Sequence, residues 1–125
     1  MIDHVSIPVS DLDMSQKFFD AVLAPLGMTR MVTLPERAAY GKRYPELWLN
    51  LRPEMGRVPA GTGSHLALRV REEAALRAAY DAALQYGGSD AGPPGPRQAA
   101  LTSYIGAFFT DPDGNRIELM TFPAG

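Results

Sequence analysis

The stretch that decides the fold is Ile2-Asp3-His4-Val5-Ser6-Ile7-Pro8-Val9, because the chain contains it twice. When the sequence is shifted by 61 positions, Gly63-Ser64-His65-Leu66-Ala67-Leu68-Arg69-Val70 lies over it and His4 matches His65. The match continues in four identical pairs: Asp20 and Asp81, Ala21 and Ala82, Leu23 and Leu84, and Gly27 and Gly88. Such self-similarity indicates one supersecondary unit that is used twice.

The repeat gives the two histidines a meaning that neither has alone. His4 and His65 are the only histidines of the chain. One histidine on a strand is commonly a hydrogen-bonded structural residue. Two copies of a unit usually pack about a pseudo-twofold axis, where equivalent residues come close to one another. The symmetric placement therefore predicts that both histidines serve one site.

Length and composition favour one globular domain over residues 1–125, with modules at about 1–52 and 63–123 joined by a Gly/Pro linker. The net charge of -2 carries little information, but Lys and Arg are scattered without a basic run, so neither nucleic acid nor an anionic membrane surface is expected as a partner. The lack of cysteine excludes disulfides, thiolate metal sites and cysteine nucleophiles. Neither a signal peptide nor a membrane span is evident, so a cytoplasmic protein is expected.

Hydrophobic spacing predicts the order strand, helix, strand, strand, strand in the first module. Apolar residues alternate over 5–9, which predicts a strand with His4 on the face away from the core. Ser10-Asp11-Leu12-Asp13 offers a helix cap. The helix ends near Gly27, and its apolar stripe consists of Phe18, Phe19, Val22, Leu23 and Leu26. Three short strands follow at about 28–34, 38–41 and 47–51.

The second module is expected to repeat this order and to complete an α+β fold. A strand with core residues Leu66, Leu68 and Val70 precedes a helix that opens at Glu72 and stops at Gly87-Gly88. The stripe of this helix is expected to be Leu76, Ala79, Tyr80, Ala83 and Leu84. The proline-rich residues 89–103 predict an irregular loop, either a lid or a plain surface excursion. A hairpin then joins strands at 104–110 and 115–122 through Asp111-Pro112-Asp113-Gly114.

Glu118 is the third candidate of the site, because alternation along the last strand puts it on the side of the histidines. An unpaired buried charge is strongly unfavourable. Glu118 is therefore expected to pair with an arginine such as Arg52 or Arg69, to face solvent, or to bind a metal. Two imidazoles and one carboxylate bind one face of a divalent metal and leave positions for water or substrate. The metal interpretation uses His4, His65 and Glu118.

The sequence resembles the vicinal oxygen chelate superfamily, the group of glyoxalases, bleomycin-resistance proteins and extradiol dioxygenases. The resemblance spans nearly the whole chain and rests on three motifs: His4-Val5-Ser6 with Val9-Ser10-Asp11-Leu12, Phe18-Phe19-Asp20-Ala21-Val22-Leu23-Ala24-Pro25-Leu26-Gly27, and Asp111-Pro112-Asp113-Gly114-Asn115-Arg116-Ile117-Glu118. It implies two βαβββ modules related by pseudo-twofold symmetry, which form an open, cup-shaped mixed sheet with helices outside. It also implies a divalent metal (Fe, Mn, Zn or Ni) held by His4, His65 and Glu118.

Three departures from the family leave the reaction open among isomerisation, lyase, transferase and oxygenase chemistry. Glyoxalase I and its relatives commonly take a fourth ligand from the strand that here carries Trp48 and Asn50. Extradiol dioxygenases usually add an acid-base histidine, and only Tyr104 or Tyr40 could replace it, with a shifted pKa. Fosfomycin-type thiol transferases share the ligand set, but no cluster of basic residues for a phosphonate is evident in the sequence.

These patterns predict a metal-dependent enzyme whose small substrate chelates the metal through neighbouring oxygens. The alternative is a bleomycin-resistance-like protein that binds a small molecule without chemistry. Glu118 and Tyr104 are the candidate catalytic residues. The expected substrate-binding residues are Trp48, Asn50, Gln98, Phe108 and Met120, with Phe108 placed across the hairpin from Glu118. The modules could pair within one chain or be exchanged in a homodimer.

Overall fold

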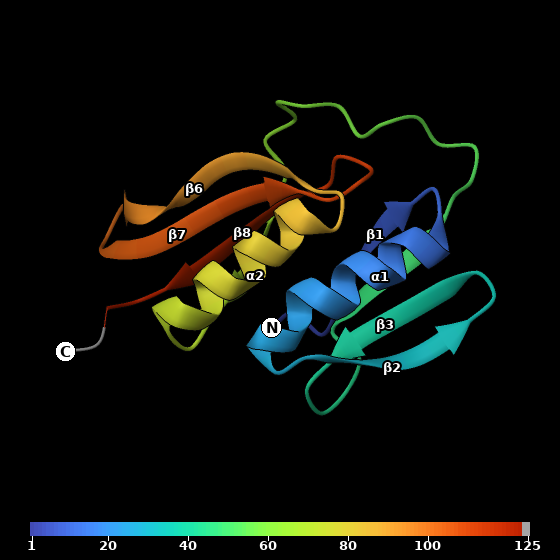
Figure 1. The fold of residues 1–125 in the computed structure, drawn as a ribbon, viewed down its shortest axis with the longest axis horizontal. Helices are drawn as coiled ribbons and strands as arrows, with labels where there is room; N and C mark the ends of the chain where they lie inside the picture. Colours follow the sequence, from blue (N-terminus) through green and yellow to red (C-terminus); the bar gives the residue numbers. More distant parts are fainter. Residues whose placement is uncertain (124–125) are drawn as a thin grey trace.

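The computed structural model describes residues 1–123 and has the predicted α+β architecture (Figure 1). The first module contains β1 (Val5–Val9), α1 (Leu12–Leu23), the short 3-10 helix η1 (Ala24–Leu26), β2 (Thr29–Leu34), β3 (Arg37–Gly41) and β4 (Leu47–Leu51). The second module contains β5 (Leu66–Arg69), α2 (Glu73–Gln85), β6 (Ser89–Gln98), β7 (Ser103–Thr110) and β8 (Arg116–Thr121). No helix within residues 1–123 is long and apolar enough to cross a membrane.

The two modules have the same sheet topology, which confirms the repeat. The strand orders are β1-β4-β3-β2 and β5-β8-β7-β6, and the first strand of each module lies parallel to the last. The other neighbouring strands are antiparallel. β1 and β5 each pair on one side only, so two separate four-stranded sheets form in the described chain. A cup that unites both sheets stays a prediction for the assembled protein.

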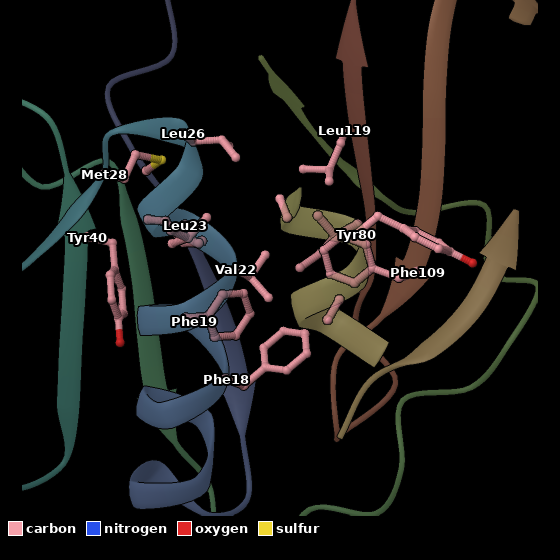
Figure 2. Close-up of a cluster of buried hydrophobic side chains, with 14 of the residues drawn as sticks. Phe18, Phe19, Val22, Leu23, Leu26, Met28, Tyr40, Tyr80, Phe109 and Leu119 are labelled. Atoms are coloured by element: carbon pink, nitrogen blue, oxygen red, sulfur yellow. The ribbon is translucent and has the colours of Figure 1, made fainter. Parts of the chain in front are cut away.

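The helices lie between the strands of the two sheets and pack against one another (Figure 2). The stripe of α1 is buried as predicted, and Phe18 reaches across to Phe109 of β7, with ring centroids 6.0 Å apart. Each helix covers one face of its own sheet with apolar contacts. The opposite face of each sheet is left free of helices, and these open faces are turned away from each other because both helices lie between the sheets (Figures 1 and 2).

Short-range signals explain where the helices begin and end. The carboxylate of Asp11 caps α1 by accepting a hydrogen bond from the Met14 amide at 3.0 Å. η1 ends at Gly27, whose φ of 76° lies in the left-handed region that glycine adopts without strain. α2 follows the extended Glu72 as predicted.

Two expectations about the second module were wrong. Residues 89–98 are not an irregular loop but the edge strand β6, which pairs antiparallel with β7. An edge strand tolerates prolines because one side needs no hydrogen-bond donors, and register shifts around Gly92 accommodate the rest. Leu84 is not a core residue, since 41% of it is exposed, whereas Leu76 on the same helix is fully buried.

The turn between β7 and β8 is built around a buried carboxylate. Asp111 accepts hydrogen bonds from the amides of Asp113 and Asn115 and from the side chain of Asn115. The same Asn115 side chain donates to the carbonyl of Pro8 in β1 at 2.9 Å. The motif that was predicted only as a turn therefore also connects the two modules.

Candidate metal centre

The predicted site residues lie on the open faces of the two sheets, except Gln98, whose register partner Ser103 alternates with the buried Ala107 and Phe109. On the first sheet, His4, Trp48 and Asn50 line one pocket of about 620 Å³. On the second sheet, Glu118 of β8 stands opposite Ala67 of β5 and opposite Phe108 of β7, which confirms the predicted pair across the hairpin.

His65 and Glu118 are brought together by the parallel pairing of β5 and β8. The Nε2 atom of His65 lies 3.1 Å from Oε1 of Glu118. The hydroxyl of Tyr104 donates a hydrogen bond of 2.7 Å to the other oxygen, Oε2. The side chain of Glu118 is 7% exposed, whereas that of His65 is 39% exposed. A buried carboxylate is thus presented beside an imidazole that solvent can reach.

The expected ion pair between Glu118 and an arginine is wrong. Within residues 1–123, the only basic side chain within 4.0 Å of Glu118 is His65. Arg52 donates to the carbonyl of Leu51, and Arg69 lies 4.5 Å over the ring of Phe122. Among residues 1–123, the buried carboxyl group of Glu118 therefore has no lysine or arginine beside it, and burial of a carboxylate is unfavourable unless a cation compensates its charge.

His4 does not join the other two candidate ligands within one chain. Its Nδ1 atom lies 2.7 Å from Oδ1 of the neighbouring Asp3, and half of the side chain is exposed. No three His, Cys, Asp or Glu side chains of residues 1–123 are close enough to hold a metal together. The part of the chain that is described contains two ligands of the predicted triad at one place and the third ligand elsewhere.

The pair His65 and Glu118 fits a divalent metal, since an imidazole nitrogen and a carboxylate oxygen converge and no lysine or arginine of residues 1–123 pairs with the carboxylate. The hydrogen bond from Tyr104 to the remaining carboxylate oxygen resembles the outer-shell contacts that orient metal ligands. Two protein ligands alone are fewer than metal enzymes use. The site therefore fits a metal in chemistry and is one ligand short in number.

Three further candidates have different surroundings. Phe108 contacts the edge of the His65 ring, with centroids 5.6 Å apart. Met120 shares the open face, opposite Gly106 and Arg69. Gln98 lies at the end of β6 and hydrogen-bonds to Ser103, without a hydrogen bond to His65 or Glu118.

The tyrosines do not suit the role of a base at neutral pH. The hydrogen bond to Glu118, together with burial, raises the pKa of Tyr104. Tyr40 is fully buried against α1, where its hydroxyl contacts Gln16 and Asp20. Burial there raises the pKa of Tyr40 above its usual range. A tyrosine base would need a lowered pKa, so Tyr104 is better described as a hydrogen-bond donor to Glu118.

A set of arginines on the open faces was missed in the sequence. Arg116 lies 4.8 Å over the ring of Phe108, and Arg37 lies 5.5 Å over Trp48 on the other sheet. Arg97 of β6 pairs with Tyr104, and Arg69 completes the set. Within residues 1–123, none of the four forms an ion pair with a carboxylate. Strand parity could have revealed two of them, because Arg69 and Arg116 alternate in phase with His65 and Glu118.

The chain folds into two modules of the same topology, and comparison with known proteins identifies the family that has this architecture. The family model for the Glyoxalase/Bleomycin resistance protein/Dioxygenase superfamily matches residues 1–119. The chain belongs to this superfamily.

The individual relatives have sequence identities of about a third or less to this chain. The chain is 31% identical over 124 residues to "Metallothiol transferase FosB" of Shouchella clausii (strain KSM-K16), covering 96% of this chain and 79% of that protein. A glyoxalase/bleomycin resistance protein from Albidiferax ferrireducens T118 has a TM-score of 0.85 and 30% identity, covering 95% of this chain and 97% of that one. Fosfomycin resistance protein FosX from Mesorhizobium loti has a TM-score of 0.71 at 16% identity, covering 98% and 92% of the two chains, which shows a shared fold.

Proposed function

We propose that the protein is a divalent-metal-dependent enzyme that acts on a small molecule. The observation that carries this proposal is the contact between His65 Nε2 and Glu118 Oε1, which lie 3.1 Å apart. Glu118 is 5% exposed, and no lysine or arginine within residues 1–123 pairs with it. A bound Fe, Mn, Zn or Ni ion would compensate the buried charge. The curated relative is named a metallothiol transferase, which supports a metal-dependent role.

His4 of a second copy is the proposed third ligand. Within residues 1–123 of one chain His4 does not join His65 and Glu118. The helices lie between the two sheets, so the open faces of the sheets are turned away from each other (Figure 1). The unpaired edges of β1 and β5 allow a second copy to place its first sheet beside the second sheet of this chain. A symmetric dimer would then contain two equivalent sites, each with His4 from one copy and His65 and Glu118 from the other.

The substrate is proposed to carry an acidic group. Arg37, Arg69, Arg97 and Arg116 lie on the two open faces, which such a dimer would bring together. Guanidinium groups bind carboxylates and phosphonates through paired hydrogen bonds. Stacking of Arg116 on Phe108 and of Arg37 on Trp48 orients each guanidinium, and neither group forms an ion pair with a carboxylate of residues 1–123. Trp48 and Phe108 also supply apolar contact for the rest of the substrate.

The chemistry follows from what each group can contribute. The metal, when bound, acts as a Lewis acid that polarises substrate oxygens. His65 and Glu118 hold the metal, Tyr104 holds Glu118, and the arginines orient the substrate. Transfer of a thiol to the substrate is the reaction that the name of the curated relative favours. Glyoxalase-like isomerisation is less favoured, because Trp48 and Asn50 occupy the strand from which a fourth ligand is expected.

Metal content of the purified protein tests the proposal. Elemental mass spectrometry of the metal-replenished protein is expected to find about one divalent ion per chain, the ligand sets being equal in number to the chains. H65A and E118Q are expected to lose the ion while circular dichroism shows an unchanged fold. H4A should lose the ion as well, although His4 is separated from His65 and Glu118 within a single chain. Wild-type protein that stays free of metal after replenishment would contradict the proposal.

The second candidate is a protein that binds a small molecule without chemistry. It is favoured by one observation, the absence of a three-ligand group in the described part of a single chain. In that case Trp48 and Phe108 would bind an apolar ligand, and quenching of the single tryptophan would detect it. Binding that is equal in wild type and E118Q, without any metal, would select this candidate.

A further inference from the structure

We infer that Tyr104 is a positioning residue, which holds one oxygen of Glu118 and so leaves the other oxygen for the metal. This inference rests on the proposed function and adds a role that the ligand set does not include. Tyr104 comes from β7, next to the strand that carries Glu118, and its hydroxyl crosses the open face to reach the carboxylate.

The two oxygens of Glu118 have different partners. Oε1 lies 3.1 Å from His65, the second candidate ligand, and therefore points to the place where a metal would be shared. Oε2 accepts the 2.7 Å hydrogen bond from Tyr104. A carboxylate can bind a metal with one oxygen or with both. Because the hydroxyl engages Oε2, this glutamate is prepared to use Oε1 alone, which keeps one more coordination position open for substrate.

Gly106 makes the hydrogen bond sterically feasible. It lies between Tyr104 and Phe108 on β7, and the ring of Tyr104 occupies the space that a side chain at residue 106 would need. A Cβ atom at residue 106 would lie 2.8 Å from Cε2 of Tyr104 and 3.4 Å from Oε2 of Glu118. Even an alanine would therefore push the ring away from the carboxylate. The glycine thus provides the space in which the ring lies across the strand.

Arg97 confines the ring from the neighbouring strand. Its Cγ atom would lie 3.1 Å from a Cβ at Gly106, and its register partner is Tyr104 itself. The guanidinium is anchored by hydrogen bonds to the carbonyls of Pro93 and Pro96. The ring of Tyr104 is therefore bordered by the glycine and by an arginine that β6 holds in place. A tyrosine ring that is confined in this way suits the orientation of the metal ligand Glu118 better than it suits proton transfer.

Two variants test the inference by independent means. Y104F removes the hydroxyl and keeps the ring, whereas G106A keeps the hydroxyl and displaces the ring. G95A is the matched control, because Gly95 pairs with Gly106 in the sheet and an added Cβ would meet only Arg97, at 4.0 Å. Y86F, at an exposed tyrosine beyond α2, is the control for loss of a hydroxyl. The readouts are Mn²⁺ affinity by titration and the position of Glu118 in crystal structures of the metal-free variants.

Y104F and G106A are each expected to weaken Mn²⁺ binding about 10- to 100-fold, the usual effect of losing an outer-shell contact. The double variant should lose no more than either single one, because both changes remove the same contact. The controls should bind like wild type. Wild-type affinity in Y104F, with Glu118 unmoved, would overturn the inference. If wild-type protein binds no metal, the proposed function fails, and the position of Glu118 in the metal-free structures alone decides the role of Tyr104.

Discussion

Asp113 in the last turn accepts two hydrogen bonds from Ser10 at the end of the first strand. The amide of Ser10 donates to Oδ2 at 3.0 Å and its hydroxyl donates to Oδ1 at 2.5 Å, although the residues are 103 positions apart. Asp113 is nearly buried, so these bonds connect the two modules away from solvent. The turn of the second module is thus part of the interface with the first.

Substitution of Asp113 by alanine is expected to destabilise the fold by about 2–4 kcal/mol, because two hydrogen bonds to a charged group are lost and the Ser10 amide stays unpaired. Urea unfolding gives the free energy directly. D81N, at an exposed aspartate of α2, should change it by less than about 0.5 kcal/mol. Equal stability of D113A and D81N would show that the contact does not hold the modules together.

Asp111 predicts a pH dependence of stability. Burial raises the pKa of this carboxyl to about 6, above the value near 3.9 of an exposed aspartate. The folded state therefore retains the proton to higher pH than the unfolded state. The contribution of Asp111 to the free energy of unfolding is fully present below about pH 4. It is lost as the pH rises through about 6, which lowers the free energy of unfolding by roughly 3 kcal/mol.

The D111N variant tests the assignment, since the amide cannot ionise and keeps one oxygen for the backbone donors. Its stability should change less between pH 4 and 6 than that of wild type. Urea unfolding across this range measures the difference. Parallel pH profiles for the two proteins would assign the titration to other carboxyl groups.

The two leucines of α2 predict contrasting effects of the same substitution. L76A should cost about 2–5 kcal/mol, since it leaves a cavity beneath a fully buried position. L84A should cost less than about 1 kcal/mol, because the side chain is largely exposed in one chain. Thermal unfolding distinguishes them. A large loss for L84A that grows on dilution would instead show that Leu84 is covered by a second copy.

The open-face arginines predict binding of anions. Phenylphosphonate titrated into the metal-free protein should bind about 10-fold more weakly to R116Q and to R97Q, since a charge-assisted hydrogen bond contributes about 1.5–3 kcal/mol. R77Q serves as the control, because Arg77 lies on α2 and pairs with Glu73. Calorimetry gives the dissociation constants. Benzyl alcohol binding as tightly as the phosphonate would remove the case for an acidic substrate.

The secondary structure of each module was predictable because the hydrophobic periodicity and the turn residues indicate the same elements that the buried core requires. The apolar stripe of α1, the strand spans of the first module and the closing hairpin follow from periods of 3.6 and 2 and from turn residues. β6 was missed because its prolines contradict strand propensity, and only its place at the sheet edge permits them. Leu84 was misplaced because helical spacing cannot tell how far the core extends around α2.

Sequence parity predicted which candidate side chains share a face, and it predicted the geometry of the candidate site only in part. Parity along β5 and β8 placed His65 beside Glu118, since register fixes which side chains share a face. The separation of His4 could not be derived, because the sequence does not determine how two modules pack. The hydrogen bond from Tyr104 to Glu118 spans two strands and depends on the missing side chain of Gly106, and neither leaves a periodic signal.

Complementation between inactive variants is the most direct test of a site that two copies share. H4A and E118Q, mixed during refolding, form mixed dimers in which one site has both defects and the other has all three ligands. Random pairing predicts recovery of about a quarter of the wild-type metal content, whereas each variant alone binds none. Metal content that stays at zero in the mixture, while wild-type protein refolded in parallel binds its metal, would contradict a site built from two chains.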